Sequence, residues 1–224
     1  MFVVNDMPKQ IDPALVTLLE QAETATIGHF LYDGFVDRRI APLIRGKRVA
    51  GTAVTLRLPH ADSTLLHYVT KFCRPGDIVL IDRSGDDKYA CWGGGLALAM
   101  KLAGVKAGII DGPATDLIEI EQFDMPMWCR GLSSITTRLL GIGGEMNVPI
   151  SVGGQVVHPG DAVLADEQGV LVLAPAAAKE AAERALAMQA REKISHDRLR
   201  AGEKLPDMSG ATAIVEAKLV KSRT

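Results

Sequence analysis

The fold of this chain is decided by the stretch from Trp92 to Asp116, which reads WGGGLALAMKLAGVKAGIIDGPATD. Its glycine triplet precedes an apolar segment, predicted to be a helix that stops at Gly104. A short buried strand is predicted next, at Ala107–Ile110. Amides at the N-terminus of a helix hold anions, and a carboxylate beside them can hold a hard cation such as Mg²⁺. The stretch therefore predicts a pocket for a small anion and a metal.

The segments around this stretch predict an alternation of strands and helices. A helix is expected after the Asp12-Pro13 pair, and the other predicted elements before residue 131 are strands at 48–58, 77–82 and 127–130 and a helix at 62–72. Short apolar runs between turns predict a meander of antiparallel strands at 148–173, and an alanine-rich helix is predicted from Pro175 to about Arg200. One α/β domain spanning residues 1–224 fits this pattern.

Composition excludes several classes of function. The 224 residues carry a formal net charge of -2, which favours neither nucleic acid nor a membrane surface as a partner. No apolar run reaches the roughly 18 residues that a membrane helix needs. Cys73, Cys91 and Cys129 are scattered without metal-ligand spacing, which is typical of reduced thiols. We therefore expect a cytoplasmic protein without a nucleic-acid or membrane partner.

An ordered set of motifs carries a resemblance to a known family. The motifs are GTAVT at 51–55, PGDIVLID at 75–82, WGGGLA at 92–97, DGPATD at 111–116, CRG at 129–131 and GGQVVHPGDAVLADEQGVLVL at 153–173. With these motifs the chain resembles the family of the regulator of ribonuclease activity A and the class II pyruvate aldolases, which act on 4-hydroxy-4-methyl-2-oxoglutarate and 4-carboxy-4-hydroxy-2-oxoadipate. The resemblance covers residues 12–203 and implies a swivelling β/β/α domain, assembled as ring-like trimers that often pair into hexamers. It also implies an active site between neighbouring subunits.

The resemblance further implies roles for individual residues. The amides of Gly94, Gly95 and Leu96 would hold the carboxylate of pyruvate, and Asp116 would hold Mg²⁺ or Mn²⁺, largely through water. Glu192, on the C-terminal helix of a neighbouring subunit, is the candidate for ordering the waters of the metal. Cleavage or decarboxylation of a 2-oxo acid leaves an enolate, whose charge a divalent ion can absorb as a Lewis acid.

Two departures from the family pattern bear on function. The arginine that precedes the metal-binding aspartate is Thr115 here, and Gly94 replaces the glutamate of the common WGELLA motif. Threonine cannot replace a bidentate arginine contact to a carboxylate. Arg83 and Arg130 are the candidates for a replacement cation. Thr115 and Arg130 are accordingly predicted to touch substrate, and Thr115 is predicted to join Asp116 and Glu192 in the catalytic group.

Three functions follow from these observations. The preferred one is a divalent-metal-dependent lyase that acts on a small 2-oxo acid, with activity altered or weakened by Thr115. The second is a non-enzymatic regulator that binds another protein, as family members that inhibit ribonuclease E do. The third, a menaquinone methyltransferase, has little support because the sequence lacks a G-x-G-x-G cofactor loop after a first strand.

Simpler structural roles compete with these functions at single residues. Asp116 by itself would more often cap a helix than bind a metal. Asp111 is expected to close the turn after its strand. Trp92 is expected to pack at a contact between subunits.

Overall fold

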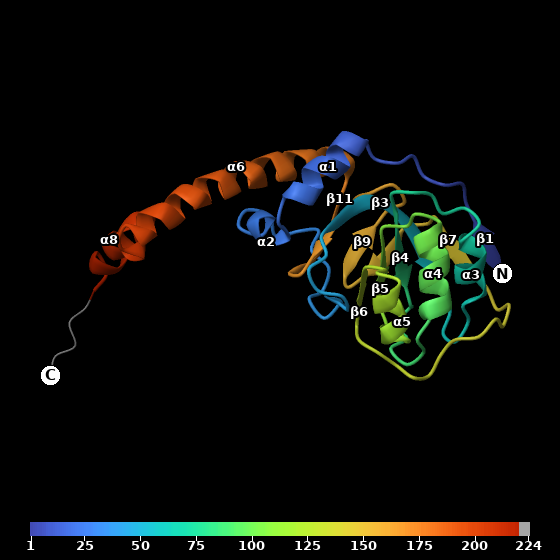
Figure 1. Cartoon of the computed structure of the whole chain (residues 1–224). Coiled ribbons are helices and arrows are strands. Elements are labelled where there is room, and N and C mark those ends of the chain that lie inside the picture. Colours follow the sequence, from blue (N-terminus) through green and yellow to red (C-terminus); the bar gives the residue numbers. More distant parts are fainter. Residues whose placement is uncertain (220–224) are drawn as a thin grey trace.

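The centre of the molecule is a nine-stranded sheet in the computed structural model, which describes residues 1–219 (Figure 1). Its main path runs β1-β7-β3-β4-β5-β6-β2, and β10 joins it by pairing with both β3 and β11. The strands are β1 (Phe2–Val4), β2 (Ala41–Pro42), β3 (Val49–Arg57), β4 (Asp77–Asp82), β5 (Ala107–Ile110), β6 (Met127–Cys129), β7 (Gly144–Met146), β10 (Ala162–Asp166) and β11 (Gly169–Leu173).

Strands β3, β4, β5 and β6 are parallel neighbours, in a register that pairs Val54 with Val79 and Leu80 with Ile109. Helices α3 (Thr64–Val69), α4 (Gly94–Leu102) and α5 (Leu117–Gln122) follow β3, β4 and β5 in the chain. Their apolar side chains share one hydrophobic cluster with residues from one face of these strands. Parallel strands joined through helices place the helices on the faces of the sheet.

The opposite face of the sheet is covered by strands rather than helices. The hairpin of β8 (Ile150–Val152) and β9 (Gln155–Val157) packs there, in a cluster with Ile78, Leu80 and Ile109. Helices α1 (Pro13–Gln21), α2 (Thr24–Ile27) and α6 (Pro175–Arg200) pack around β10 and β11. The resulting order of hairpin, sheet and helices confirms the expected α/β class with β/β/α layering.

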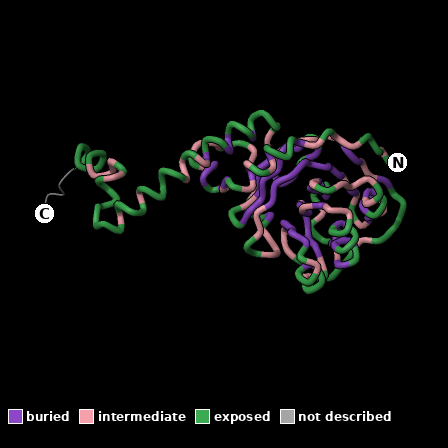
Figure 2. Tube along the Cα trace, turned by 45° about the horizontal axis from the view of Figure 1, so that its top comes forward, coloured by how far each residue is buried: buried purple, intermediate pink, exposed green. Residues whose placement is uncertain are grey.

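Helix α6 begins on the domain and then leaves it as a long arm (Figures 1 and 2). Its buried residues are all in its first three turns: Ala178, Ala181, Ala182 and Ala185. Beyond them the arm is mainly exposed and continues into α7 (Leu205–Ser209) and α8 (Ala211–Glu216), which bury none of their residues. The predicted helix at about 175–200 is confirmed, although most of its length covers no part of its own domain.

The local patterns predicted most of the elements that surround the glycine triplet. The strands at 48–58 and 77–82 are found as β3 and β4, and the helix at 62–72 is shorter than expected. The meander at 148–173 forms two hairpins, of which the second belongs to the main sheet. No helix among residues 1–219 is both long enough and apolar enough to span a membrane.

Candidate functional site

The parallel strands bring charged residues to one edge of the sheet. Arg57 and Asp82 end β3 and β4, and Asp111 and Arg130 directly follow β5 and β6. Helix α4 also starts at this edge, because it leads from the carboxyl end of β4 back to the start of β5. Ligands of parallel α/β sheets bind at the carboxyl ends of the strands. We therefore place the candidate site around the N-terminus of α4.

The first turn of α4 joins a carboxylate to free amides. The amide of Gly94 donates a hydrogen bond of 3.0 Å to Oδ2 of Asp116. Among residues 1–219, no acceptor is bonded to the amides of Gly95 or Leu96. A side chain at Gly95 would meet only open space, so the helix terminus is accessible there. Two unpaired amides at a helix N-terminus are suited to binding a carboxylate.

Asp116 caps a helix, but not the one that follows it. The residue directly precedes α5, yet its carboxylate makes no hydrogen bond to that helix and reaches Gly94 of α4 instead. Its backbone is left-handed, with φ 56° and ψ 45°. Aspartate tolerates this conformation better than most residues do, at a modest cost in energy. The conformation turns an exposed carboxylate across the gap between two helices.

Because residues 93 and 94 are glycines, acidic side chains can occupy the space where their own side chains would be. A Cβ on Gly93 would lie 2.4 Å from Oδ2 of Asp116, and one on Gly94 would lie 1.5 Å from Oε2 of Glu119 and 2.7 Å from its Cβ. Glu119 therefore lies over the position where a side chain of residue 94 would be. Glu119 is not among the site residues predicted from the sequence, because no helix was predicted at 117–122. The spacing of three residues between Asp116 and Glu119 is a local hint of a shared face, but it does not encode the contact between Glu119 and α4.

Thr115 lies beside the same glycines. Its amide donates to the carbonyl of Trp92 at 2.9 Å, and its Oγ1 lies 3.3 Å from Oδ1 of Asp116. A Cβ on Gly93 would lie 3.0 Å from Cγ2 of Thr115. The structure thus places Thr115 beside Gly93 and Asp116, with a hydroxyl rather than a charge next to the carboxylate.

Trp92 does not lie where it was expected, at a contact between subunits. Its side chain is fully buried, not exposed for a contact between subunits, and it packs against Gly108 of β5. A Cβ on Gly108 would lie 3.0 Å from two ring atoms of Trp92. The ring thus fills a space in the core that a glycine on the neighbouring strand provides.

Arg130 is held by acidic neighbours at the edge of the sheet. Its Nε donates to Oδ1 of Asp111 at 2.5 Å, and its Nη1 lies 3.8 Å from Oδ2 of Asp37. Asp111 also accepts from the amide of Gly153 at 2.7 Å, so its carboxylate joins the end of β5 to the turn between β8 and β9 rather than closing its own turn as expected. Arg39 beside Asp37 lowers the pKa of the Asp37 carboxyl, so this group is ionised in the physiological range.

Arg83, the other candidate cation, is completely buried. Its Nη2 donates to the carbonyls of His60 and Tyr89, while Nε and Nη1 have no partner within the described chain. No hydrogen bond between residues 1 and 219 joins Arg83 to Thr115 or Asp116. In this structure Arg83 secures the loop after β4 rather than supplying a charge to the first turn of α4.

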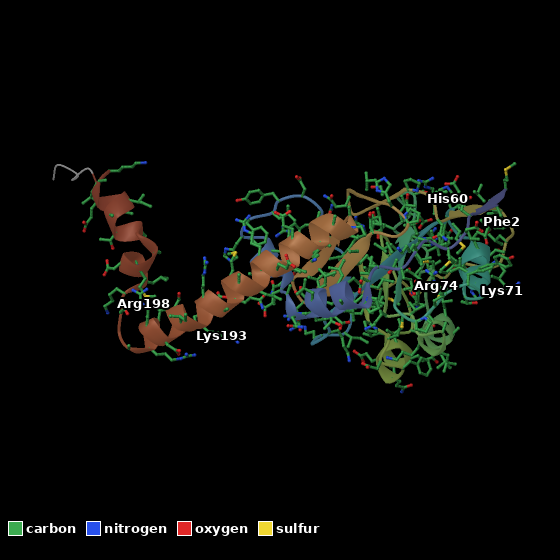
Figure 3. All side chains as sticks on the ribbon, turned by 90° about the horizontal axis from the view of Figure 1, so that it is seen from above. Phe2, His60, Lys71, Arg74, Lys193 and Arg198 are labelled. Atoms are coloured by element: carbon green, nitrogen blue, oxygen red, sulfur yellow. The ribbon has the colours of Figure 1, made fainter. Side chains whose placement is uncertain are left out.

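Glu192 lies on the exposed part of the α6 arm. Figure 3 labels its neighbour Lys193 on this arm, well away from the body of the domain that carries His60 and Arg74. The structure therefore does not bring Glu192 to Asp116 of the same chain. Its expected role depends on a second copy of the chain.

The residues present fit a weakly held divalent cation. Within residues 1–219 no three histidine, cysteine or acidic side chains gather as a metal-binding group. Mg²⁺ requires no such group, because it keeps several waters and is commonly bound through one or two carboxylates plus substrate. Asp116, exposed and oriented by Gly94, matches that requirement.

A layered α/β domain with an open helix N-terminus beside an oriented carboxylate is the architecture that this chain shares with a known family. The chain is a member of the RraA-like family, described as Aldolase/RraA, whose model matches residues 24–172. A relative from Halalkalibacterium halodurans, named "Putative 4-hydroxy-4-methyl-2-oxoglutarate aldolase", is 32% identical over 60% of this chain and 63% of its own, a little under two thirds of its length. A relative of the same name from Deinococcus radiodurans is 32% identical over 59% of this chain and 84% of its own.

One similar solved structure is described by reference to ribonuclease inhibition rather than to an aldolase. It is described as RraAS2 of Streptomyces coelicolor, "an unusual member of the RNase ES inhibitor RraA protein family". It matches 84% of this chain and 99% of its own with a TM-score of 0.75 and 25% identity. The fold is thus shared by relatives named as putative aldolases and by one described as a member of a ribonuclease-inhibitor family, so the fold alone does not decide between the two activities.

Proposed function

We propose that this chain is a divalent-metal-dependent lyase that cleaves or decarboxylates a small 2-oxo acid. The observation that carries the proposal is the pair of free amides at Gly95 and Leu96 beside the exposed carboxylate of Asp116. An anion site next to a cation site suits a substrate whose carboxylate and keto oxygens are adjacent. The names of the relatives support the same class of substrate.

In this proposal each residue has a limited task. The amides of Gly95 and Leu96 hold the substrate carboxylate, and Asp116 is the residue that would hold Mg²⁺ or Mn²⁺. The bound ion would supply Lewis-acid stabilisation of the charge that develops on the 2-oxo acid. The hydrogen bond from Gly94 keeps the Asp116 carboxylate in one orientation before substrate arrives, so that little reorganisation is needed.

Three further residues complete the proposed site. Arg130 is a candidate for contact with the distal part of the substrate, although substrate would have to share it with Asp111. Glu192 would come from the arm of a neighbouring copy, in a homotrimer or homohexamer. Thr115 supplies a neutral hydroxyl next to Asp116, which leaves less positive charge for the reaction than an arginine would.

The proposal is tested by incubating the full chain with oxaloacetate and Mg²⁺ and measuring the pyruvate released. We expect release above the spontaneous rate, and we expect EDTA or Asp116→Asn to abolish the excess. Oxalate, which mimics the enolate of pyruvate, should bind more tightly than pyruvate if the site stabilises that enolate. Absence of both turnover and oxalate binding in the presence of Mg²⁺ would refute the lyase.

The second candidate is a regulator that binds another protein without turnover. The uncharged Thr115 favours it, and so does a run of exposed aliphatic side chains on the loop that follows β6. These side chains are Leu132, Ile135, Leu139, Leu140 and Ile142, each about half exposed or more. Exposed apolar groups that are close together mark interaction surfaces. Failure to bind oxalate would favour this candidate.

A further inference from the structure

Two carboxylates lie at the first residue of α4, where the proposed site binds an anion. Asp116 accepts the hydrogen bond of the Gly94 amide, and Glu119 lies over the Cα of the same residue. Both come from one short segment, the residue before α5 and the first turn of α5. Without ligand, the chain thus places its own acidic groups around its own anion site.

Within the part of the chain that the structure describes, no lysine or arginine forms an ion pair with either of these two groups. The ion pairs within residues 1–219 include neither Asp116 nor Glu119. The nearest compensation is the partial positive charge of the helix terminus, which a carboxylate already engages through Gly94. An incoming carboxylate would therefore meet the free amides of Gly95 and Leu96 together with two negative charges.

We propose that Glu119 makes binding of the 2-oxo acid depend on a divalent cation that binds first. The inference rests on the proposed function, since it assigns Glu119 to the same site. A divalent cation at Asp116 would offset the negative charge of both side chains, directly or through its waters. Without that cation, Glu119 repels the substrate carboxylate from amides that are otherwise free.

Glu119 comes close to Gly94 of another helix, which is not expected of a glutamate that only stabilises the first turn of its own helix. A first-turn glutamate favours its own helix wherever its side chain points. Glu119 instead occupies space that only a glycine at position 94 leaves open. Glu121, also exposed on α5, lies two residues further along and so on a different face of the helix. It therefore provides a matched control for the loss of one negative charge.

The test is a calorimetric titration of oxalate into the full chain, first with EDTA and then with Mg²⁺. Wild type, Glu119→Gln and Glu121→Gln are compared, and urea unfolding checks that each is folded. We expect wild type and Glu121→Gln to bind oxalate weakly without Mg²⁺ and more tightly with it. Glu119→Gln should bind oxalate roughly fivefold more tightly without Mg²⁺, because like charges about 4 Å apart repel by that factor in water. Its gain from Mg²⁺ should be correspondingly smaller.

The other outcomes separate this inference from the proposed function. If Mg²⁺ promotes oxalate binding equally in wild type and Glu119→Gln, the role of Glu119 is wrong and the lyase proposal stands. If both glutamine variants gain affinity equally, the effect is one of net charge and the role of Glu119 is again wrong. If no protein binds oxalate even with Mg²⁺, both proposals fail.

Discussion

The amide of Gly94 donates a 3.0 Å hydrogen bond to the carboxylate of Asp116, 22 residues further along the chain. This bond ties the first residue of α4 to the residue before α5. The left-handed backbone of Asp116 makes the contact possible, since it turns the side chain away from the helix that follows. A carboxylate oriented in this way is fixed at one oxygen and still has lone pairs for a cation.

Replacement of Asp116 separates its two roles. Asp116→Asn retains an oxygen for the Gly94 amide but loses the charge, so we expect at least tenfold weaker Mn²⁺ binding with little change in stability. Asp116→Ala also loses the hydrogen bond and should destabilise the fold by about 1 kcal/mol, as the loss of a helix cap does. Mn²⁺ titration and urea unfolding measure these effects. Unchanged Mn²⁺ affinity in Asp116→Asn would remove Asp116 from the metal site.

The glycines of the triplet should differ sharply in their tolerance of alanine. Gly94→Ala places a methyl group 2.7 Å from the Cβ of Glu119, so α5 must shift, and we expect a loss of about 1–3 kcal/mol. Gly95→Ala meets no atom within 4 Å and should be neutral or stabilising by up to about 1 kcal/mol, because alanine favours the helix. Chemical denaturation of both variants gives the comparison. Equal effects would argue against the contact between Gly94 and Glu119.

Local patterns predicted the strands and helix α4, but not how α4 and α5 lie against each other. The periodicity of residues 48–58 and the glycines before Leu96 are local signals, and β3 and α4 match them. Helix α5 has only six residues, which are too few to establish a helical period of apolar residues in the sequence. It also follows Asp116, whose backbone is left-handed. The place of Glu119 depends on how α5 crosses α4, which spacing along the chain does not encode. The burial of Trp92 was not predicted for the same reason, because it depends on Gly108 of β5, which makes room for the ring.

Stability should fall in acid through a buried carboxylate outside the site. Burial raises the pKa of Asp62, but hydrogen bonds from Thr64, Leu140 and Ile142 outweigh it and lower that pKa to about 2. Because the folded pKa is depressed, this stabilisation is complete above pH 5. It is lost as the pH falls towards 2, at a cost of about 2 kcal/mol. Urea unfolding at pH 7 and pH 3 measures it.

The control for this acid effect is a change of charge alone. Asp62→Asn should lower stability at pH 7, because an amide cannot accept from all the donors that the carboxylate satisfies. It should also remove part of the difference between pH 7 and pH 3. Asp87→Asn, at an exposed position, should leave that difference unchanged. A wild-type difference that persists in full in Asp62→Asn would assign the acid effect to other groups.

The chain should assemble in solution. The loop after β6 exposes 63% of Leu139, and the arm exposes 64% of Ile194 and of Ile214, surfaces that a second copy would cover. Light scattering at micromolar concentration is expected to give the mass of a trimer or hexamer, and Leu139→Glu should lower it. A monomeric mass for wild type would also withdraw Glu192 from the proposed site, because the exposed part of α6 that carries it lies away from α4 of the same chain (Figure 1).

Thr115→Arg tests whether the missing charge limits the reaction. The side chain of Thr115 lies next to the Asp116 carboxylate, with 3.3 Å between Oγ1 and Oδ1, so an arginine there would start beside the proposed metal ligand. One well-placed cation is worth about 3 kcal/mol at the transition state, or roughly a hundredfold in rate. We expect oxaloacetate decarboxylation to rise by up to that factor. The gain should vanish when Asp116→Ala is added, because both residues serve the same developing charge. If wild type is already fast and Thr115→Arg slows it, then Thr115 is a working part of a pocket shaped for another substrate.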